Sequence, residues 1–203
     1  MGTDTETLWA VITGAVLATV GGFAATQLEG FLRRRERERS AALLFGEILS
    51  VIELVAALAD RSRGQGDPYG PFTMRLMRAV RRETDAYDRN RESLFDLRDA
   101  KLRAQIHALM VRITLTLEGI FDSAEQIGLT ETALKALGAD DPARTELTER
   151  LESAKETRAS AFDFVVETTA ETKPIIEMLK PLARETFDAY ATVVQRSGLP
   201  ARP

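Results

Sequence analysis

The chain has 203 residues and a net charge of −4, with 44% hydrophobic and 29% charged residues. This composition is too apolar for a disordered protein, and the chain is long enough to bury one core. The absence of cysteine excludes disulfides, thiolate nucleophiles, zinc knuckles and iron–sulfur clusters. Arginine outnumbers lysine 22 to 5, an imbalance that we associate with GC-rich bacterial genomes.

Residues 7–28 form the longest uncharged stretch of the chain. As a helix they span about 33 Å, which is enough to cross a hydrocarbon core of about 30 Å. A cleaved signal peptide would carry positive charge before its apolar part, whereas Asp4 and Glu6 precede this one. N-myristoylation is excluded because Glu6 occupies the position that requires Ser or Thr. We therefore predict a transmembrane anchor within residues 1–32.

The segment that follows this stretch is strongly basic. Residues 33–40 contain Arg33, Arg34, Arg35, Arg37 and Arg39. By the positive-inside bias, this flank stays in the cytoplasm and the short N-terminus lies outside. The predicted location is a bacterial inner (plasma) membrane, and these arginines are predicted to contact lipid headgroups.

Small residues recur at every fourth position of the predicted span. They are Ala10, Gly14, Ala18, Gly22, Thr26 and Gly30. This spacing places them on one helix face, and close backbone approach along such a face is a main route to helix association in lipid. The stripe predicts a homo-oligomer or a subunit of a larger membrane complex. The alternative is that it reflects only the high Gly and Ala content of membrane spans.

Residues 41–59 are also apolar, apart from a stripe of Gly46, Glu47, Ser50 and Glu53. A second membrane crossing is the alternative interpretation, but each of the two carboxylates would raise its insertion free energy by about 2.5–3.5 kcal/mol. We predict a buried bundle helix. Because residues 33–39 contain no Gly or Pro, we expect one continuous helix to join it to the span.

Residues 61–71 are rich in Gly and Pro and predict a loop. It does not match a phosphate-binding loop, which needs a preceding strand and a following Lys-Ser/Thr. The next helix starts near Phe72, and its predicted apolar side contains Phe72, Leu76, Met77 and Val80.

The same helix carries a basic group without an acid until Glu83: Arg75, Arg78, Arg81 and Arg82. We consider Arg75, Arg78 and Arg82 as candidate contacts of lipid headgroups. The plainer alternative is a solvated face that pairs with acids elsewhere. Nucleic acid is not a predicted partner, because the chain is acidic overall and no reading motif accompanies the group.

Residues 87–97 interrupt the helical pattern, and Asp96 or Asp99 is placed to cap the next helix. The interruption carries Tyr87, Asn90, Leu94 and Leu97. Together with the span, the arginine-rich exit and the sequence LLFGEILSVIELV, it resembles small uncharacterised bacterial single-span membrane proteins over about residues 8–120. The resemblance implies a membrane anchor with a cytoplasmic helical domain, and it carries no catalytic residues.

Residues 101–127 show the clearest helical pattern of the cytoplasmic part. Its apolar face contains Leu102, Ile106, Leu109, Ile113, Leu117 and Ile120. His107, the one histidine, lies beside this face and is predicted to be a boundary or core residue. One histidine without cysteine cannot build a paired Glu-x-x-His or an HExxH site, so we predict no metal, cofactor or catalytic residue.

The C-terminal third predicts three more helical pieces. A turn at Gly128 should precede a short helix from Thr130 to Gly138, and Asp141-Pro142 should start a longer one. The predicted seam of the longer helix contains Leu147, Leu151, Ala154, Ala161 and Val165, with Arg158 interrupting it in a loose or hydrated stretch. A break at Lys173-Pro174 should precede a last helical segment from Ile175 to Val194, and residues 198–203 should be a disordered tail.

The predicted fold is therefore all-α: an N-terminal transmembrane helix that continues into a cytoplasmic antiparallel bundle over residues 41–197, with about four to six helices in all. The leading functional hypothesis is a non-enzymatic membrane-anchored scaffold, or an accessory subunit of a membrane protein complex, that acts by protein–protein interaction. A membrane-bound signalling or stress-response module is the alternative. An enzyme or transporter component ranks third.

Overall fold

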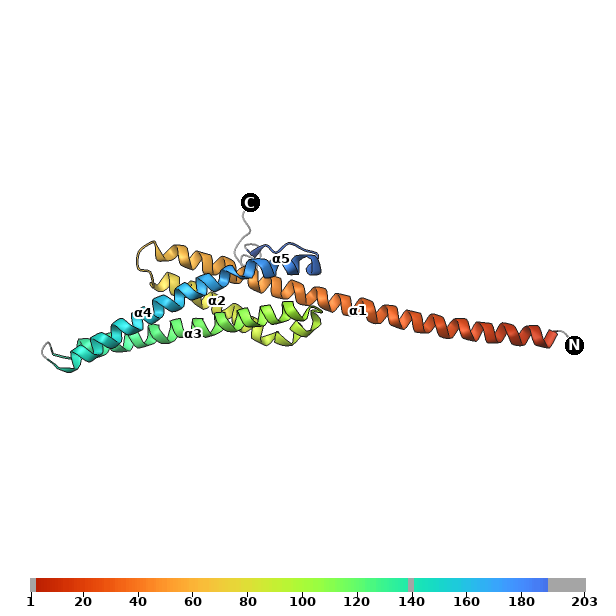
Figure 1. Cartoon of the computed structure of the whole chain (residues 1–203), viewed down its shortest axis with the longest axis horizontal. Helices are drawn as coiled ribbons and strands as arrows, with labels where there is room; N and C mark the ends of the chain where they lie inside the picture. The colour runs from red at the N-terminus through yellow and green to blue at the C-terminus, as the bar shows by residue number, and fades with distance from the viewer. Residues whose placement is uncertain (1–2, 139–140, 190–203) are drawn as a thin grey trace.

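One helix, α1 (Thr3–Arg63), runs through most of the length of the molecule (Figure 1). The computed structural model describes residues 3–138 and 141–189, except for the side chains of residues 3–21 and 23–26. α1 continues without interruption from the uncharged stretch through the arginine-rich segment into residues 41–59. This confirms the predicted continuous helix, while the side chains of most of the predicted span lie outside the described residues.

α2 (Pro71–Arg89) and α5 (Thr172–Ala183) pack along the second half of α1, and α3 (Ala100–Ala136) packs mainly against α4 (Ala143–Ala170). The buried hydrophobic residues of this half are Ala41, Ala42, Phe45, Ile48, Leu49, Val51, Ile52, Val55, Ala56 and Ala59. Within the described part of the chain, one helical segment, Gln27–Arg63, is long and apolar enough to span a membrane, and 61% of its apolar window is buried in the bundle. This burial confirms residues 41–59 as a core helix.

α1 ends where Gly64, Gly66 and two prolines make further helix unfavourable, and Gly66 adopts a φ of +114° that favours glycine. α2 (Pro71–Arg89) begins with proline in its first turn and returns along α1. The hydroxyl oxygens of Ser62 and Thr73, 2.7 Å apart, fix the register of the two helices. Met74, Met77 and Val80 are buried, but Phe72 is 64% exposed. Its predicted burial is wrong because residues 73, 74, 77 and 80 define the face toward α1.

A short 3-10 helix, η1 (Arg91–Asp96), turns the chain into α3 (Ala100–Ala136). The Asp99 side chain caps α3 by accepting hydrogen bonds from the backbone N–H groups of Lys101 and Leu102, at 2.8 and 3.2 Å. All six residues of the predicted apolar face of α3 are buried. The predicted turn at Gly128 is wrong, because α3 continues through it with Ile127 and Thr130 buried on either side.

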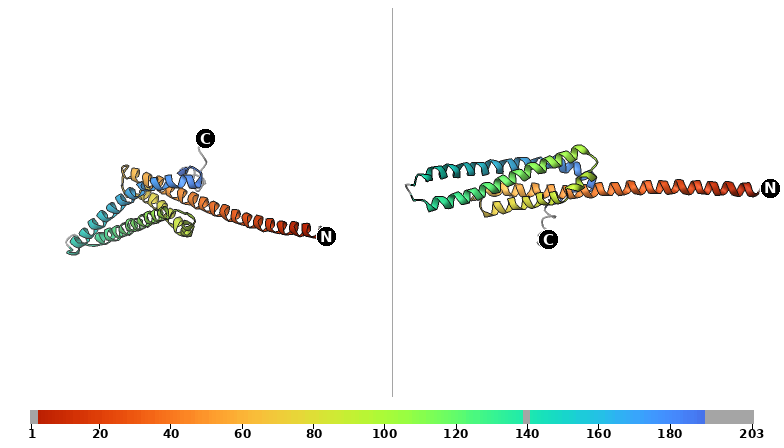
Figure 2. Two further views of the ribbon diagram at one scale, coloured as in Figure 1. Left: turned by 45° about the vertical axis from the view of Figure 1, so that its right-hand side comes forward. Right: turned by 90° about the horizontal axis from the view of Figure 1, so that it is seen from below.

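α3 and α4 (Ala143–Ala170) form an antiparallel hairpin whose closed end projects beyond the other helices (Figure 2). A separate small cluster of Ile127, Leu151 and Ala154, with Leu134 packed against it, holds this end together. We call this projecting part of the hairpin the arm. Two predicted seam residues, Leu151 and Ala154, belong to this cluster, whereas Val165 and Ala161 belong to the main core.

Arg158, which interrupts that seam, packs against the loop between α1 and α2. Its guanidinium carbon lies 3.9 Å from the ring centroid of Tyr69, and Arg63 lies 5.6 Å from the same ring. The Nε atom of Arg158 is buried without a hydrogen-bond partner. Arg158 therefore packs on the ring of Tyr69 at a seam position where an apolar residue would be expected. This contact joins the loop to α4.

α4 ends at Ala170, and α5 (Thr172–Ala183) returns along α1 with Pro174 in its first turn. The break near Lys173-Pro174 is confirmed. α5 ends at Ala183 because Arg184 adopts the left-handed conformation, with φ of 56°. The predicted continuous helix toward Val194 is therefore wrong over residues 184–188, and residues 190–203, with the predicted tail, lie outside the described residues. No strand occurs in the part of the chain that the structure describes, and the fold is all-α.

Candidate functional site

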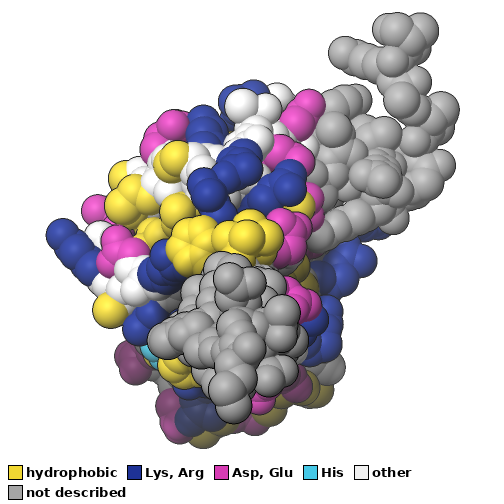
Figure 3. Space-filling model, turned by 90° about the vertical axis from the view of Figure 1, so that its right-hand side faces the viewer, with side chains coloured by type: hydrophobic (Ala, Val, Ile, Leu, Met, Phe, Trp, Pro, Cys, Tyr) yellow, Lys and Arg dark blue, Asp and Glu magenta, His cyan; other side chains and the backbone are white. Residues whose placement is uncertain are grey.

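The surface with the most unusual chemistry surrounds α1 where it leaves the bundle. Exposed hydrophobic side chains and arginines from three parts of the chain meet there (Figure 3). We call this group the collar. It consists of Leu28, Phe31, Leu32, Arg33, Arg34, Arg35 and Arg37 of α1, Phe95 of η1, Arg98 in the segment after η1, and Arg184 directly after α5.

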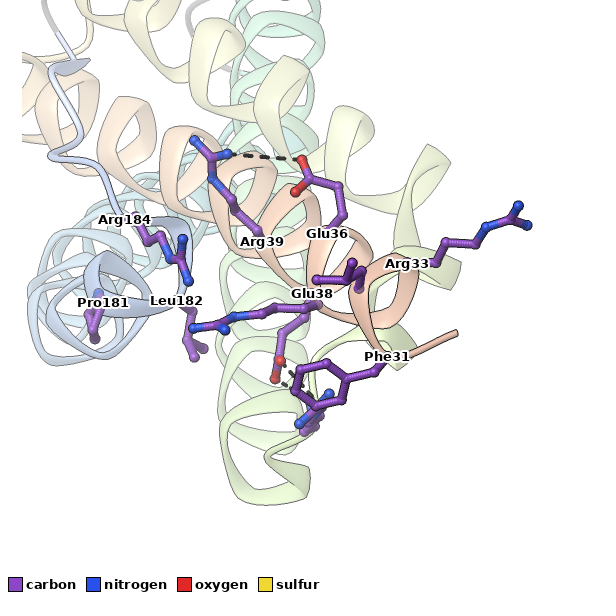
Figure 4. Close-up of a pocket in the computed structure, with 11 residues that line it drawn as sticks. Phe31, Arg33, Glu36, Glu38, Arg39, Pro181, Leu182 and Arg184 are labelled. Atoms are coloured by element: carbon purple, nitrogen blue, oxygen red, sulfur yellow. Dashed lines mark hydrogen bonds and ion pairs between the residues drawn. The ribbon is translucent and has the colours of Figure 1, made fainter. Parts of the chain in front are cut away.

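Two open hollows flank α1 within the collar. The first, of about 760 Å³, lies between α1 and the end of α5, where Leu182 and Arg184 face Phe31 (Figure 4). The second, of about 610 Å³, lies between α1 and η1. It is lined by Gln27, Gly30, Phe31, Arg34, Arg37, Phe95, Asp96 and Arg98. Both hollows combine aromatic or aliphatic walls with guanidinium groups, a combination that suits an amphiphilic ligand or surface.

Phe95 is presented to the outside by a fixed segment. Its side chain is 79% exposed, while its neighbours Leu94 and Leu97 are 8% and 0% exposed. The segment is held from α1, because Glu38 accepts a hydrogen bond from the backbone N–H of Arg98 at 3.2 Å and pairs with its side chain at 3.3 Å. Arg98 also lies over the ring of Phe31, 5.8 Å from its centroid. The exposure of Phe95 is thus a feature of ordered structure.

The five arginines predicted after the span have different surroundings. Arg34, Arg35 and Arg37 form no ion pair with any described residue, and Arg33 pairs with Glu29 at 2.5 Å in an exposed contact. Arg39 instead donates to the carbonyl oxygen of Ala183 at 3.1 Å and lies 3.4 Å from Glu185. Arg39 fastens α1 to the end of α5, so we remove it from the predicted headgroup contacts.

Arg75, Arg78 and Arg82 lie far from the collar. The contact between Ser62 and Thr73 places the start of α2 about 48 Å along α1 from Gly30, and Arg82 lies about 14 Å back along α2. Arg82 is therefore about 24 Å along α1 from Arg37, the nearest collar residue of that helix, and Arg75 and Arg78 lie farther away, at several Debye lengths in physiological salt. If residues 7–28 cross a membrane, these arginines do not reach its headgroups. The prediction for these three is withdrawn.

These arginines line a third hollow, of about 780 Å³, between α2 and α3. Arg81 lies over the ring of Phe121 from α3, 5.4 Å from its centroid, while Asp85 and Glu125 also line the space. Arg75, Arg78 and Arg82 form no ion pair within the described residues. The lining combines four arginines with Asp85 and Glu125, so the hollow has mixed charge with an excess of positive charge.

Four residues of the predicted packing stripe fall outside the described side chains: Ala10, Gly14, Ala18 and Thr26. A Cβ atom added to Gly22 or Gly30 would meet no atom within 4 Å. Bulky residues at these two positions would therefore cause no clash within the chain itself. The stripe stays a prediction about contacts with another helix.

His107 lies at the boundary of the α3 apolar face, as predicted, with its Nδ1 atom 2.9 Å from the hydroxyl of Tyr87. Burial raises the pKa of the Tyr87 hydroxyl. Across the described residues there is no group of three or more His, Cys, Asp or Glu side chains that could hold a metal ion. This Tyr–His pair links α2 to α3.

Sequence reasoning missed the hydrophobic collar members of α1, namely Leu28, Phe31 and Leu32. It also missed the members from outside α1, namely Phe95, Arg98 and Arg184. The segment Leu94-Phe95-Asp96-Leu97 has three large apolar residues in four positions. A sequence pattern cannot tell which of the three faces outward, because η1 follows neither a 3.6-residue nor a 2-residue period. No family model, curated protein or solved structure matches this chain.

Proposed function

We propose that this protein is a membrane-anchored helical scaffold or accessory subunit that binds other proteins through a domain held at the cytoplasmic face. Residues 7–28 cross the membrane once, and the arginines that follow keep the domain in the cytoplasm. The protein acts without catalysis.

The observation that carries the proposal is the continuity of α1. The same helix that contains the uncharged stretch also forms the centre of the bundle, with Phe45 and Ile52 buried in the core. No loop separates the uncharged stretch from the bundle, so the domain is held close to the membrane face. A soluble enzyme would gain nothing from this rigid support, whereas a scaffold needs its binding surfaces at a defined height.

The arm supplies a surface for partners at the far end. α3 and α4 extend beyond the main core, and Leu129 on the outer part of α3 is 65% exposed. A projecting helical hairpin offers two ridged faces, which other helices recognise well. The protein would therefore contact the membrane at one end and its partner at the other.

Reporter fusions after Thr5 and after Pro203 test the anchor and its orientation. We expect only the C-terminal reporter to be cytoplasmic, and the full chain to stay in the membrane after alkaline carbonate extraction. Extraction of the intact protein would refute the anchor. An external C-terminus would refute the orientation.

The small-residue stripe provides the test of assembly. The double variant Gly14→Leu/Gly22→Leu adds bulk where another helix would approach, yet it keeps the span apolar. We expect it to lose the homo-oligomer or the co-purifying partner that native mass spectrometry detects for the wild type. Val16→Phe/Val20→Phe is the matched control, because it adds bulk on the opposite helix face. If wild type and both variants are equally monomeric and partner-free, the scaffold proposal fails.

A further inference from the structure

We propose that the collar is a second, lipid-binding contact with the membrane. In this contact Phe31 and Phe95 lie at the boundary between headgroups and acyl chains. The hollow between α1 and η1 binds the phosphate of an anionic lipid through Arg34, Arg37 and Arg98. The inference rests on the proposed membrane anchor, and it adds a site in the folded domain to the crossing helix.

The height of the collar supports this assignment. Residues 7–28 extend about 33 Å as a helix, so a core of about 30 Å ends close to Leu28. Gln27 and Gly30 line the same hollow as Phe95. The domain therefore reaches the level at which the uncharged stretch ends, and it does so with an aromatic side chain. Aromatic residues are enriched at this depth of a bilayer.

The exposure of the apolar side chains points to lipid as the occupant. Phe95 is 79% exposed, and Leu28, Phe31 and Leu32 are 60%, 50% and 54% exposed. They form one group around α1, whereas hydrophobic residues on a soluble surface usually occur singly. A bilayer surrounds the emerging helix on all sides, so it covers every member of the group at once.

The charges of the hollow fit an anionic headgroup. Arg34 and Arg37 form no ion pair with any described residue, and Arg98 spends only part of its bonding capacity on Glu38. Asp96 is the acid among the lining residues. Guanidinium groups bind phosphate oxygens in bidentate fashion, and basic side chains next to a span are attracted to an anionic membrane surface.

The depth of Phe95 can be measured with a single tryptophan. The chain has one native tryptophan, Trp9. The variant Trp9→Phe/Phe95→Trp is reconstituted as the full chain in phosphatidylcholine vesicles with about one-third phosphatidylglycerol, an anionic surface that attracts basic groups. We expect blue-shifted emission and strong quenching by lipids brominated near the headgroup. Trp9→Phe/Phe72→Trp is the control. Phe72 is also exposed, at 64%, but it lies at the start of α2, away from the collar. A tryptophan at this position should stay unquenched.

Lipid selectivity tests the phosphate site separately. In the same vesicles the wild-type chain should retain phosphatidylglycerol in preference to phosphatidylcholine, as detected by native mass spectrometry. Arg34→Gln/Arg37→Gln should lose this preference. The control Arg75→Gln/Arg78→Gln removes the same charge far from the collar and should keep it. Equal selectivity in all three proteins would overturn the site.

Carbonate extraction of the same vesicles distinguishes failure of this inference from failure of the anchor. If the chain is extracted, the proposed anchor itself is wrong. If the chain is retained but the tryptophan at position 95 behaves like the one at position 72, only the collar contact is wrong. Retention together with selective quenching supports both.

Discussion

Two stretches of α1 are both long and apolar, yet they have different surroundings. Residues 7–28 belong to the part of α1 that projects from the bundle, whereas residues 41–59 run through its core. The difference depends on the rest of the sequence. α2 and α5 carry apolar faces, such as Met77 and Leu179, that cover the second stretch. A hydropathy pattern alone cannot separate a core helix from a span, because the covering faces lie elsewhere in the chain.

The polar stripe of the second stretch shows how the two differ in detail. The ring of Phe187 packs so closely on Gly46 that an added Cβ would lie 2.0 Å from it. The Ser50 hydroxyl donates to the Gly46 carbonyl oxygen at 2.7 Å, and Glu53 lies 3.6 Å from the Lys173 ammonium. The stripe that argued against a second crossing is therefore the edge where α5 and the segment after it meet α1.

The largest expected effect comes from a charge in the covered stretch. Ile52 is fully buried, so Ile52→Lys places an unpaired ammonium in the core and should destabilise the domain by more than about 4 kcal/mol. Circular dichroism of the full chain in detergent should show loss of cooperative unfolding. Leu58→Lys is the control in the same helix, since Leu58 is 41% exposed. Equal stability of the two variants would contradict the assignment of this stretch to the core.

A charge in the projecting stretch should act on insertion instead. Val16→Lys adds about 2.5–3.5 kcal/mol to the insertion free energy at the centre of a span. We expect more of the chain to be released by carbonate, while the unfolding midpoint of the domain stays that of the wild type. A domain that unfolds with unchanged membrane retention would reverse the roles that we assign to the two halves.

A smaller effect tests the contact at Gly46. Gly46→Ala forces the Phe187 ring to move and should cost about 1–3 kcal/mol of unfolding free energy. In a Phe187→Ala background the same change should be neutral, or stabilising by up to about 1 kcal/mol, because alanine favours helix over glycine. Chemical denaturation of the four proteins gives the coupling energy. Additive effects would show that this contact does not form.

The smallest expected effect lies away from α1, at the junction of α4 and α5. Arg112 donates to Glu171 at 2.9 Å, and this hydrogen bond holds the pKa of the Glu171 carboxyl below its ordinary value. Because the pKa of Glu171 is lower in the folded chain than in the unfolded chain, the contact contributes its full stabilisation at pH values above the pKa of the unfolded state. This contribution is lost as pH falls through the pKa of the folded state.

Arg112→Gln should therefore raise the pKa of Glu171, which NMR titration of its side chain can follow. Both groups are largely solvent-exposed, so we expect less than about 1 kcal/mol at neutral pH and a smaller difference in high salt. An unchanged Glu171 pKa in the variant would show that the pair does not form in solution.

Local signals in the sequence were enough for much of this fold. The continuity of α1, the cap at Asp99 and the buried face of α3 follow from the absence of breakers, from capping chemistry and from helical period. Gly128 was misjudged because its penalty of about 1 kcal/mol in a helix is offset by packing of Ile127 against α4. That packing depends on residues more than twenty positions away.

The site was predictable only where it lies on α1. The arginines after the span are visible as a run, but their separate surroundings are not, since Arg39 meets the carbonyl of Ala183. Phe95 joins the collar because η1 turns back to α1 through Glu38. Contacts between residues so far apart in the sequence cannot be predicted from spacing or composition. The outward position of Phe72 could not be predicted for the same reason.

Because α1 is unbroken, a tilt of the proposed anchor would also move the far end of the helix. From Phe31 to Arg63 the helix extends about 48 Å, so a change of 10° in the tilt of its membrane half would carry the far end sideways by about 8 Å. Arg63 pairs with Asp163 and lies 4.5 Å from the ring centroid of Phe162, so α4 must follow. Changes in bilayer thickness, which set helix tilt, would thus become displacements of the arm.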